Sequence, residues 1–428
     1  MPGEKVKDIK VAAATAEILG DDSMVIGGGI HPQYVSGQEG KIRASAIVIE
    51  GNIRLCLVSC DVLMVGGDIL DEVCGSIEAD FDIPFENILI TATHTHHAPT
   101  TVTCHGYSRD EVFCTRMKDS ILSTVRTATN RLKGVNEAEM YFWLGEESTV
   151  GQNSRLLMED DTIHWIGPRK DALRPSGPFD SELPIMAFKR TDGGMEAFFF
   201  NHSTHNIGAR QSGRRSPGFY GLAVQELEEE LGGTAIFLPG AAGSTHNLAL
   251  STDEMILRVK NAIKKALSFS KPRAISSIVS VKREIEYSIR KFDEEKEDKA
   301  VSYYCNKRLS DPEPTIEVFR RMRQRLLERQ GKVGKTWLQA VVLGDIVLVG
   351  VPGELFTELG VQIKRRSPFR YTYIVELAND YIGYIPDEEA FNLGGYQVWT
   401  GFHSFVAQGT GEAIVEEAVQ LLSDLKVL

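Results

Sequence analysis

Apolar residues recur along the chain with two different spacings. Short apolar runs rich in β-branched residues predict buried strands, and apolar positions three or four residues apart predict amphipathic helices. The predicted strands lie at residues 47–49, 55–58, 87–93, 195–200 and 235–238, and the predicted helices at residues 67–78, 109–133, 219–231, 252–268 and 409–425. Strands that alternate with helices predict the α/β class, with mixed β-sheets layered with helices.

Residues 282–333 interrupt this pattern because they are dense in charge, as in the run FRRMRQRLLER at 319–329. We interpret this segment as a solvated helical excursion on one face, with a partner-binding arm as the alternative. The apolar runs that follow it, at 338–343 and 346–349, flank Gly344 and Asp345. Two apolar runs joined by two such residues predict a β-hairpin.

Composition narrows the function classes. The chain has 428 residues, with 47 Lys and Arg against 59 Asp and Glu, and so a net charge of −12. Such a charge argues against binding to nucleic acid or to an anionic membrane surface. The 42% of hydrophobic residues exclude disorder as the main state. A stretch of about 18 apolar residues and an apolar leader at the N-terminus are both missing, so we expect a cytoplasmic protein without stable membrane insertion.

The six cysteines form no CxxC pair, and two of them lie in the strand predicted at 55–58 and just beyond it. This usage is typical of small buried side chains in a reducing compartment rather than of disulfides or a catalytic thiol.

The histidines gather behind three predicted strands. His94, His96 and His97 follow the first, His202 and His205 follow the second, and His246 comes after a glycine-rich turn behind the third. The carboxyl ends of strands in α/β sheets are where ligands usually bind, so we expect a metal site there. Zinc takes about four ligands from His, Cys, Asp and Glu.

Alternation along an extended segment places His94 and His96 on the same face, so that one binds the metal and the other faces the substrate. His97 would point the other way, where it either supports a ligand from behind or has a structural role. We expect His205 to support a ligand from behind, and Asp61 to do the same.

Two later segments also suggest chemistry. The segment GVPGELFT at 350–357 holds Glu354 at a turn after an apolar strand, beside the edge where the histidines lie. The alternative is an acid that stabilises a helix N-terminus. The tyrosines of NDYIGYIP, at 379–386, and of GGY, at 394–396, are also compatible with an ordinary packed loop.

Together these pieces resemble the neutral/alkaline non-lysosomal ceramidase family. The resemblance spans residues 10–428. The matching pieces, in order, are ATHTHHAP at 92–99, GQNSR at 151–155, GPFD at 177–180, FFFNH at 198–202, the turn GSTHN at 243–247, VPGELFT at 351–357, Asn379, Tyr381 and Tyr384, Tyr396 twelve residues later, and GTGE at 409–412. The resemblance implies one ceramidase-like catalytic domain over 1–428, corresponding to the N-terminal domain of that family, with the active site at the C-terminal ends of strands.

The resemblance also implies the site residues. The ligands of one Zn²⁺ per chain would be His94, His202, Glu354 and Tyr384. His96 would act as acid and base, while Arg155 and Tyr396 would hold the substrate carbonyl oxygen. One position departs from the family pattern, because the family's serine in this turn is replaced by His246 or, in a register shifted by one residue, by Thr245. We expect His246 to take a catalytic role there, as a base or as a donor to the substrate.

We therefore expect a zinc-dependent hydrolase that cleaves an amide-like (N-acyl) bond of a soluble small molecule. The replaced serine leaves open that the same metal site cleaves a C–O bond, as in an ester, lactone or glycoside, or acts as a lyase. A non-catalytic scaffold that uses residues 282–333 as its partner surface is the third alternative. The sequence leaves a homo-oligomeric state open.

Overall fold

The computed structural model describes residues 9–135 and 137–427, and its largest element is a nine-stranded sheet. The strand order is β11-β10-β9-β5-β1-β2-β3-β4, and β13 adds to β5. The strands are β1 (Ile9–Glu17), β2 (Arg43–Glu50), β3 (Arg54–Cys60), β4 (Ile88–Ala92), β5 (Glu137–Glu146), β9 (Glu182–Arg190), β10 (Met195–His202), β11 (Thr234–Pro239) and β13 (Lys271–Pro272). The pairs β3/β4 and β10/β11 are parallel and the others antiparallel.

A second, four-stranded sheet has the order β14-β15-β16-β18, in which only β16/β18 is parallel among the strands described. Its strands are β14 (Ile278–Ser288), β15 (Val333–Leu343), β16 (Ile346–Gly350) and β18 (Tyr371–Val375). Three short pairs complete the strands: β6 (Gly151–Asn153) with β12 (Thr245–Asn247), β7 (Leu156–Met158) with β8 (Ala172–Pro175), and β17 (Glu354–Leu355) with β19 (Tyr384–Ile385).

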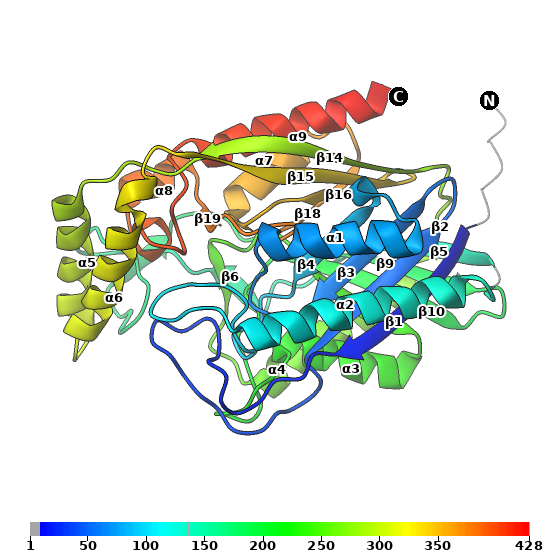
Figure 1. Cartoon of the computed structure of the whole chain (residues 1–428), viewed down its shortest axis with the longest axis horizontal. Coiled ribbons are helices and arrows are strands. Elements are labelled where there is room, and N and C mark those ends of the chain that lie inside the picture. The colour runs from blue at the N-terminus through cyan, green and yellow to red at the C-terminus, as the bar shows by residue number, and fades with distance from the viewer. Residues whose placement is uncertain (1–8, 136, 428) are drawn as a thin grey trace.

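The two sheets pack face to face between outer layers of helices (Figure 1). The helices are α1 (Gly67–Phe81), α2 (Glu111–Leu132), α3 (Gly218–Leu231), α4 (Thr252–Phe269), α5 (Glu294–Arg308), α6 (Glu313–Leu326), α7 (Thr357–Arg366), α8 (Glu388–Leu393) and α9 (Thr410–Val427). Helices α1 to α4 cover the outer face of the large sheet, and α7 and α9 cover that of the small sheet. The predicted α/β class is confirmed.

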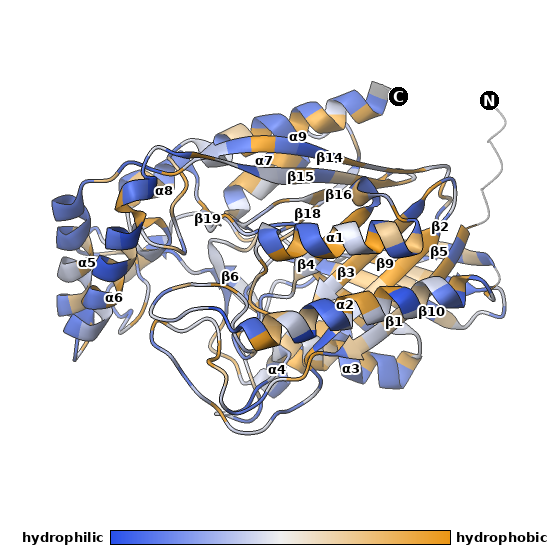
Figure 2. Cartoon of the chain, viewed as in Figure 1, coloured by the Kyte–Doolittle hydropathy of each residue, from blue (hydrophilic) through white to orange (hydrophobic). Residues whose placement is uncertain are grey.

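Alternation along β1 explains the continuous apolar run from Val11 to Ala14 in its sequence. Val11 and Ala13 face the small sheet, whereas Ala12 and Ala14 face the helices. Because successive side chains point to opposite faces, a strand buried on both sides needs a continuous apolar run. Figure 2 shows apolar residues along the strands and a mixture of apolar and polar residues along α1 and α2, whose buried residues are mostly apolar.

The charged segment forms a strand and a pair of helices. Residues 282–288 continue β14, so the helical excursion is shorter than the sequence indicates and consists of α5 and α6. Its charges are not all solvated, because the fully buried guanidinium of Arg323 pairs with Glu294 at 2.8 Å and Asp298 at 3.0 Å. The predicted hairpin is present: β15 and β16 meet at Gly344, whose φ of 65° suits a two-residue turn.

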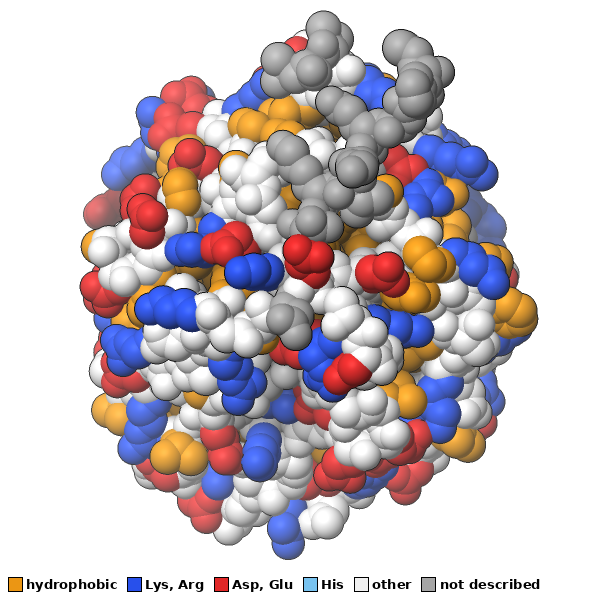
Figure 3. All heavy atoms as spheres, turned by 90° about the vertical axis from the view of Figure 1, so that its right-hand side faces the viewer, with side chains coloured by type: hydrophobic (Ala, Val, Ile, Leu, Met, Phe, Trp, Pro, Cys, Tyr) orange, Lys and Arg blue, Asp and Glu red, His pale blue; other side chains and the backbone are white. Residues whose placement is uncertain are grey.

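Charged side chains of both signs are mixed on one face of the molecule (Figure 3), and the cysteines are buried, as their usage predicts. On the face seen in Figure 3, acidic and basic side chains are interspersed rather than gathered by sign. All six cysteines are buried and free. Within residues 9–135 and 137–427, every helix is too short or too polar to span a bilayer.

The large sheet curves until its two edges approach each other. Ser59 of β3 donates its hydroxyl to the carbonyl of Phe237 in β11 at 2.7 Å, although these strands stand far apart in the strand order. The segment after β18 joins the edges, since Glu376 donates its N–H to Pro239 O at 3.0 Å and accepts at its carbonyl the Thr91 hydroxyl at 2.7 Å. The carboxyl ends of β4, β10 and β18 therefore lie together.

Asp61 is buried just behind that meeting point. Its carboxyl accepts the Arg43 N–H at 3.2 Å and the Thr93 hydroxyl at 3.3 Å. Burial raises the pKa of Asp61 to about 7, although Arg43 acts in the opposite direction. An unfolded aspartate has a pKa of about 4, so the folded state holds this proton more tightly. The stability from Asp61 is therefore complete below about pH 4 and is lost as pH rises to about 7.

We predict that Asp61→Asn removes this pH dependence, because an amide does not titrate. The free energy of unfolding of the wild type minus that of the variant should fall by about 1.4 kcal/mol per pH unit between pH 5 and 7 and level off above pH 8. Urea unfolding at each pH measures it, and a constant difference over this range would contradict the assignment.

Candidate functional site

Four side chains converge where the strands of the two sheets end. His94 lies two residues after β4, and His205 lies three residues after β10. A parallel bridge between Thr95 and Asn206 joins these two loops. Glu354 and Tyr384 come from β17 and β19, where they are direct partners in the ladder.

The donor atoms of these side chains lie at nearly equal distances. Glu354 Oε2 is 3.4 Å from His94 Nε2 and 3.4 Å from His205 Nε2, and Tyr384 Oη is 3.3 Å from His205 Nε2. These separations are longer than good hydrogen bonds, which measure about 2.7–3.2 Å. They equal the ligand–ligand distance of about 3.3 Å in a tetrahedral site with metal–ligand bonds of about 2.0–2.1 Å.

The protonation of the group also indicates a cation. His94 Nδ1 lies 2.9 Å from the carbonyl of Leu63, which can only accept, so Nδ1 carries the hydrogen. In the neutral ring, Nε2 then presents a lone pair toward Glu354 Oε2, a buried oxygen without a hydrogen-bond partner among the described residues. Burial raises the pKa of the Glu354 carboxyl, and positive charge at His94 and His205 is what would hold it well below its usual value. With neutral rings, that positive charge has to come from a bound cation.

The backbone at His94 is strained. Its φ of 59° lies in the left-handed region, which side chains other than glycine adopt at a cost of about 1 kcal/mol or more. Such strain persists where the surroundings fix it, and here the Leu63 carbonyl and the Thr95–Asn206 bridge hold the turn. The turn redirects the chain after β4, so that the ring faces Glu354.

His202 does not belong to this group, which corrects the expectation that it supplies a ligand. Its Nδ1 contacts the Tyr220 hydroxyl and its Nε2 lies 2.8 Å from the Glu147 carbonyl, so both ring nitrogens are occupied elsewhere. His202 is the last residue of β10, whereas His205 lies on the loop beyond. His205, expected to stand behind a ligand, is the histidine of this segment that faces Glu354 and belongs to the group that could hold a metal ion.

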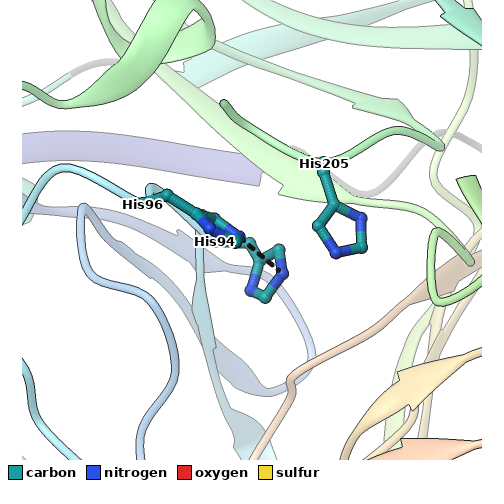
Figure 4. A group of neighbouring side chains, drawn as sticks. All are labelled: His94, His96 and His205. Atoms are coloured by element: carbon teal, nitrogen blue, oxygen red, sulfur yellow. Dashed lines mark hydrogen bonds between the residues drawn. The ribbon is translucent and has the colours of Figure 1, made fainter. Parts of the chain in front are cut away.

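His96 lies on the more open side of the cluster, where its Nε2 is 3.4 Å from His94 Nε2. Figure 4 shows the rings of His94, His96 and His205 turned toward one another from two loops. These three residues form a group that could hold a metal ion, but only His96 among them is partly exposed. Gly28 makes room for His96, since a Cβ on this residue would lie 2.4 Å from His96 Nδ1.

Of the two residues proposed in place of the family serine, His246 is the one beside the cluster. Its ring stacks on that of His205, with 4.0 Å between centroids and 28° between planes, and it is partly exposed. Thr245 is fully buried, and its hydroxyl donates to the Ser203 carbonyl at 2.8 Å. Pairing of β12 with β6 fixes both positions.

Arg155 and Tyr396 lie in one buried layer beside Tyr384. The guanidinium of Arg155 donates to Gln397 Oε1 at 2.8 Å and to the Gly394 carbonyl at 2.7 Å, so it holds the loop that carries Tyr396. Burial lowers the pKa of Arg155 to about 10, which leaves it charged at neutral pH. The ring of Tyr396 packs edge-on to that of Tyr384, with 5.9 Å between centroids.

Three neighbours of the site were not assigned a role from the sequence. The Tyr381 hydroxyl donates to Glu354 Oε1 at 3.3 Å. His105 Nε2 lies 2.8 Å from the Tyr396 hydroxyl, and the ring of His403 stacks on Tyr396 at 4.7 Å. Tyr381 belongs to the motif of Asn379, Tyr381 and Tyr384, so its contact with the site could have been predicted. His105 and His403 belong to no local sequence motif that would predict their positions. His97 has the structural role expected, since Nε2 accepts the Gly208 N–H at 2.9 Å.

Comparisons with known proteins support the fold. A scan of protein-family models and a search of curated proteins give no match. A crystal structure of neutral ceramidase from Pseudomonas aeruginosa matches with a TM-score of 0.75 and 17% identity, over 98% of this chain and 75% of that one. A structure of ceramidase complexed with C2 gives the same values. The chain therefore has the neutral ceramidase fold over nearly its whole length, in agreement with the resemblance of its motifs.

Proposed function

We propose that this protein is a zinc-dependent hydrolase that cleaves an amide-like (N-acyl) bond of a small molecule. The observation that carries the proposal is the set of four buried donors, His94, His205, Glu354 and Tyr384. Three distances between their donor atoms, 3.4, 3.4 and 3.3 Å, match those of a tetrahedral metal site. Two imidazoles, a carboxylate and a phenol oxygen suit Zn²⁺.

The fold supports the same reaction class. A ceramidase cleaves an N-acyl bond, and the Pseudomonas aeruginosa enzyme shares this architecture. When bound at such a site, zinc polarises an oxygen and makes water nucleophilic near neutral pH. The chain's own residues then have to bind the substrate, orient it and move protons.

The partly exposed side of the cluster indicates where the substrate would approach. The four proposed ligands are at most 4% exposed, whereas His96 and His246 are partly exposed. We assign to His96 the transfer of a proton between the water and the leaving nitrogen, because its Nε2 points into the cluster from that side. Tyr396 would donate its hydroxyl hydrogen to the substrate carbonyl oxygen, and Arg155 would keep the Tyr396 loop in place.

The second candidate is cleavage of a C–O bond, or a lyase reaction, at the same site. The observation that favours it is the imidazole of His246 stacked on His205, where the ceramidase family has a serine. Compared with a serine hydroxyl, an imidazole offers different hydrogen-bonding groups and leaves less space beside the scissile bond. The nature of that bond therefore has to be measured.

Removal of one ligand tests the metal site. We predict that the wild type binds one zinc per chain and that His205→Gln weakens zinc affinity by more than about 100-fold, beyond the effect typical of residues that only support ligands. His202→Gln is the matched control, since His202 lies outside the group, and it should keep its metal. Mass spectrometry of the metal content and a zinc titration measure both. Retention of metal by His205→Gln together with its loss from His202→Gln would contradict the assignment.

A substrate screen tests the reaction. We predict turnover of N-acyl compounds, and a loss of about 10²–10⁴-fold in kcat for His96→Gln with unchanged metal content, because a proton-transfer group is removed and the ligands are not. The screen compares N-acyl amines with short and long chains against the matching esters, lactones and glycosides. Activity on the C–O substrates alone would favour the second candidate and refute the first.

A further inference from the structure

Tyr396 is held more tightly than an ordinary loop tyrosine. Its ring lies between two others, parallel to Trp165 within 2° at 4.6 Å and stacked on His403 at 4.7 Å. Trp165 is fixed in turn, because its backbone N–H donates to the Tyr304 hydroxyl of α5 at 2.7 Å. Because the ring of Tyr396 is stacked on both sides, only its hydroxyl hydrogen can still rotate.

The partner of that hydroxyl is His105, at 2.8 Å from its Nε2, and both residues are at least nine-tenths buried. The direction of this hydrogen bond decides what the hydroxyl can do. If Tyr396 donates to His105, it has only lone pairs left for a substrate. If His105 donates to Tyr396, the hydroxyl hydrogen remains free for a carbonyl oxygen.

The other side of the His105 ring favours the second direction. Nδ1 lies 3.4 Å from Cys104 Sγ, within hydrogen-bond range for sulfur. Burial raises the pKa of the Cys104 thiol well above its usual value, so the thiol keeps its hydrogen and can donate it to Nδ1. Burial also lowers the pKa of His105 to about 4, although Glu354 and a hydrogen bond to the Gly29 backbone act in the opposite direction, so the ring is neutral and carries one hydrogen. With the thiol donating to Nδ1, that hydrogen is on Nε2.

The backbone holds this arrangement at the cost of strain. His105 has a φ of 51° between Cys104 and Tyr107, which form a bridge with each other. The Tyr107 hydroxyl accepts the Gly28 N–H at 2.8 Å, which ties the turn to the loop beside His96. Strained backbone held by several contacts is typical of functional positions.

We propose that His105 is a positioning residue that makes Tyr396 a hydrogen-bond donor to the substrate. Hydrogen bonds run from the Cys104 thiol to His105 Nδ1, from His105 Nε2–H to the Tyr396 oxygen, and from the Tyr396 hydroxyl to the substrate carbonyl oxygen. The last contact rests on the proposed hydrolase function, whereas the first two are properties of the protein alone.

The tautomer of His105 tests the proposal without any substrate. In ¹⁵N-histidine-labelled protein, the ring of His105, assigned by its loss in His105→Gln, should carry hydrogen on Nε2 and a lone pair on Nδ1. Tyr396→Phe should shift the Nε2–H signal, because its acceptor is removed. Cys104→Ala should shift the Nδ1 signal, and Cys104→Ser, which keeps a donor, should shift it less. Hydrogen on Nδ1 in the wild type would overturn the proposal.

Kinetics test the positioning role. His105→Leu should lower kcat by about 10–100-fold with KM within about twofold, because the variant misdirects a transition-state donor and leaves substrate binding intact. His105→Gln, whose amide nitrogen can replace Nε2–H, should stay within about fivefold of the wild type. In a Tyr396→Phe background, His105→Leu should cost less than about twofold, because His105 acts only through that hydroxyl.

Two results would contradict this role. Losses that add fully in the double variant, or a His105→Gln variant as impaired as His105→Leu at equal thermal stability, would show that His105 merely supports the fold. Lack of turnover on every substrate in the wild type would refute the hydrolase function instead. The tautomer measurement would then still decide how His105 and Tyr396 are hydrogen-bonded.

Discussion

The whole site depends on one buried carboxylate. Glu354 Oε2 faces the ring nitrogens of two histidines, each 3.4 Å away, and lacks a hydrogen-bond partner among the described residues. A buried anion that faces the lone pair of the neutral His94 ring is costly unless a cation compensates it. The simplest compensation is a metal ion equidistant from the donors, and every role proposed for the surrounding residues follows from its position.

The fold explains how distant segments supply these donors. Each proposed ligand follows a strand of a parallel pair or lies in the short β17/β19 ladder, so all four emerge on one side. The curvature of the large sheet, fixed by Ser59 and Phe237, brings β4 close to β11 and β10. The small sheet adds Glu354 and Tyr384 through the loops after β16 and β18. Strained positions such as His94 then orient individual rings.

The sequence predicts those elements whose signals are local, but it gives no separate signal for β1, β9 or α7. Apolar periodicity identifies β4, β10 and α4, and the histidine cluster at 94–97 points to the site. Choosing between His202 and His205 requires knowing where β10 ends and which way its last side chain points, and periodicity does not resolve a boundary of three residues. The pairing of His105 with Tyr396 joins residues 291 positions apart, so it arises from tertiary packing alone.

The most direct test of this account is a crystal structure of the zinc-loaded protein with anomalous data collected on both sides of the zinc absorption edge. We predict one anomalous peak per chain, about 2.0–2.2 Å from His94 Nε2, His205 Nε2, Glu354 Oε2 and Tyr384 Oη, with His202 far from it. A peak bound by His202, or a stoichiometric zinc that does not contact Glu354, would contradict the central claim.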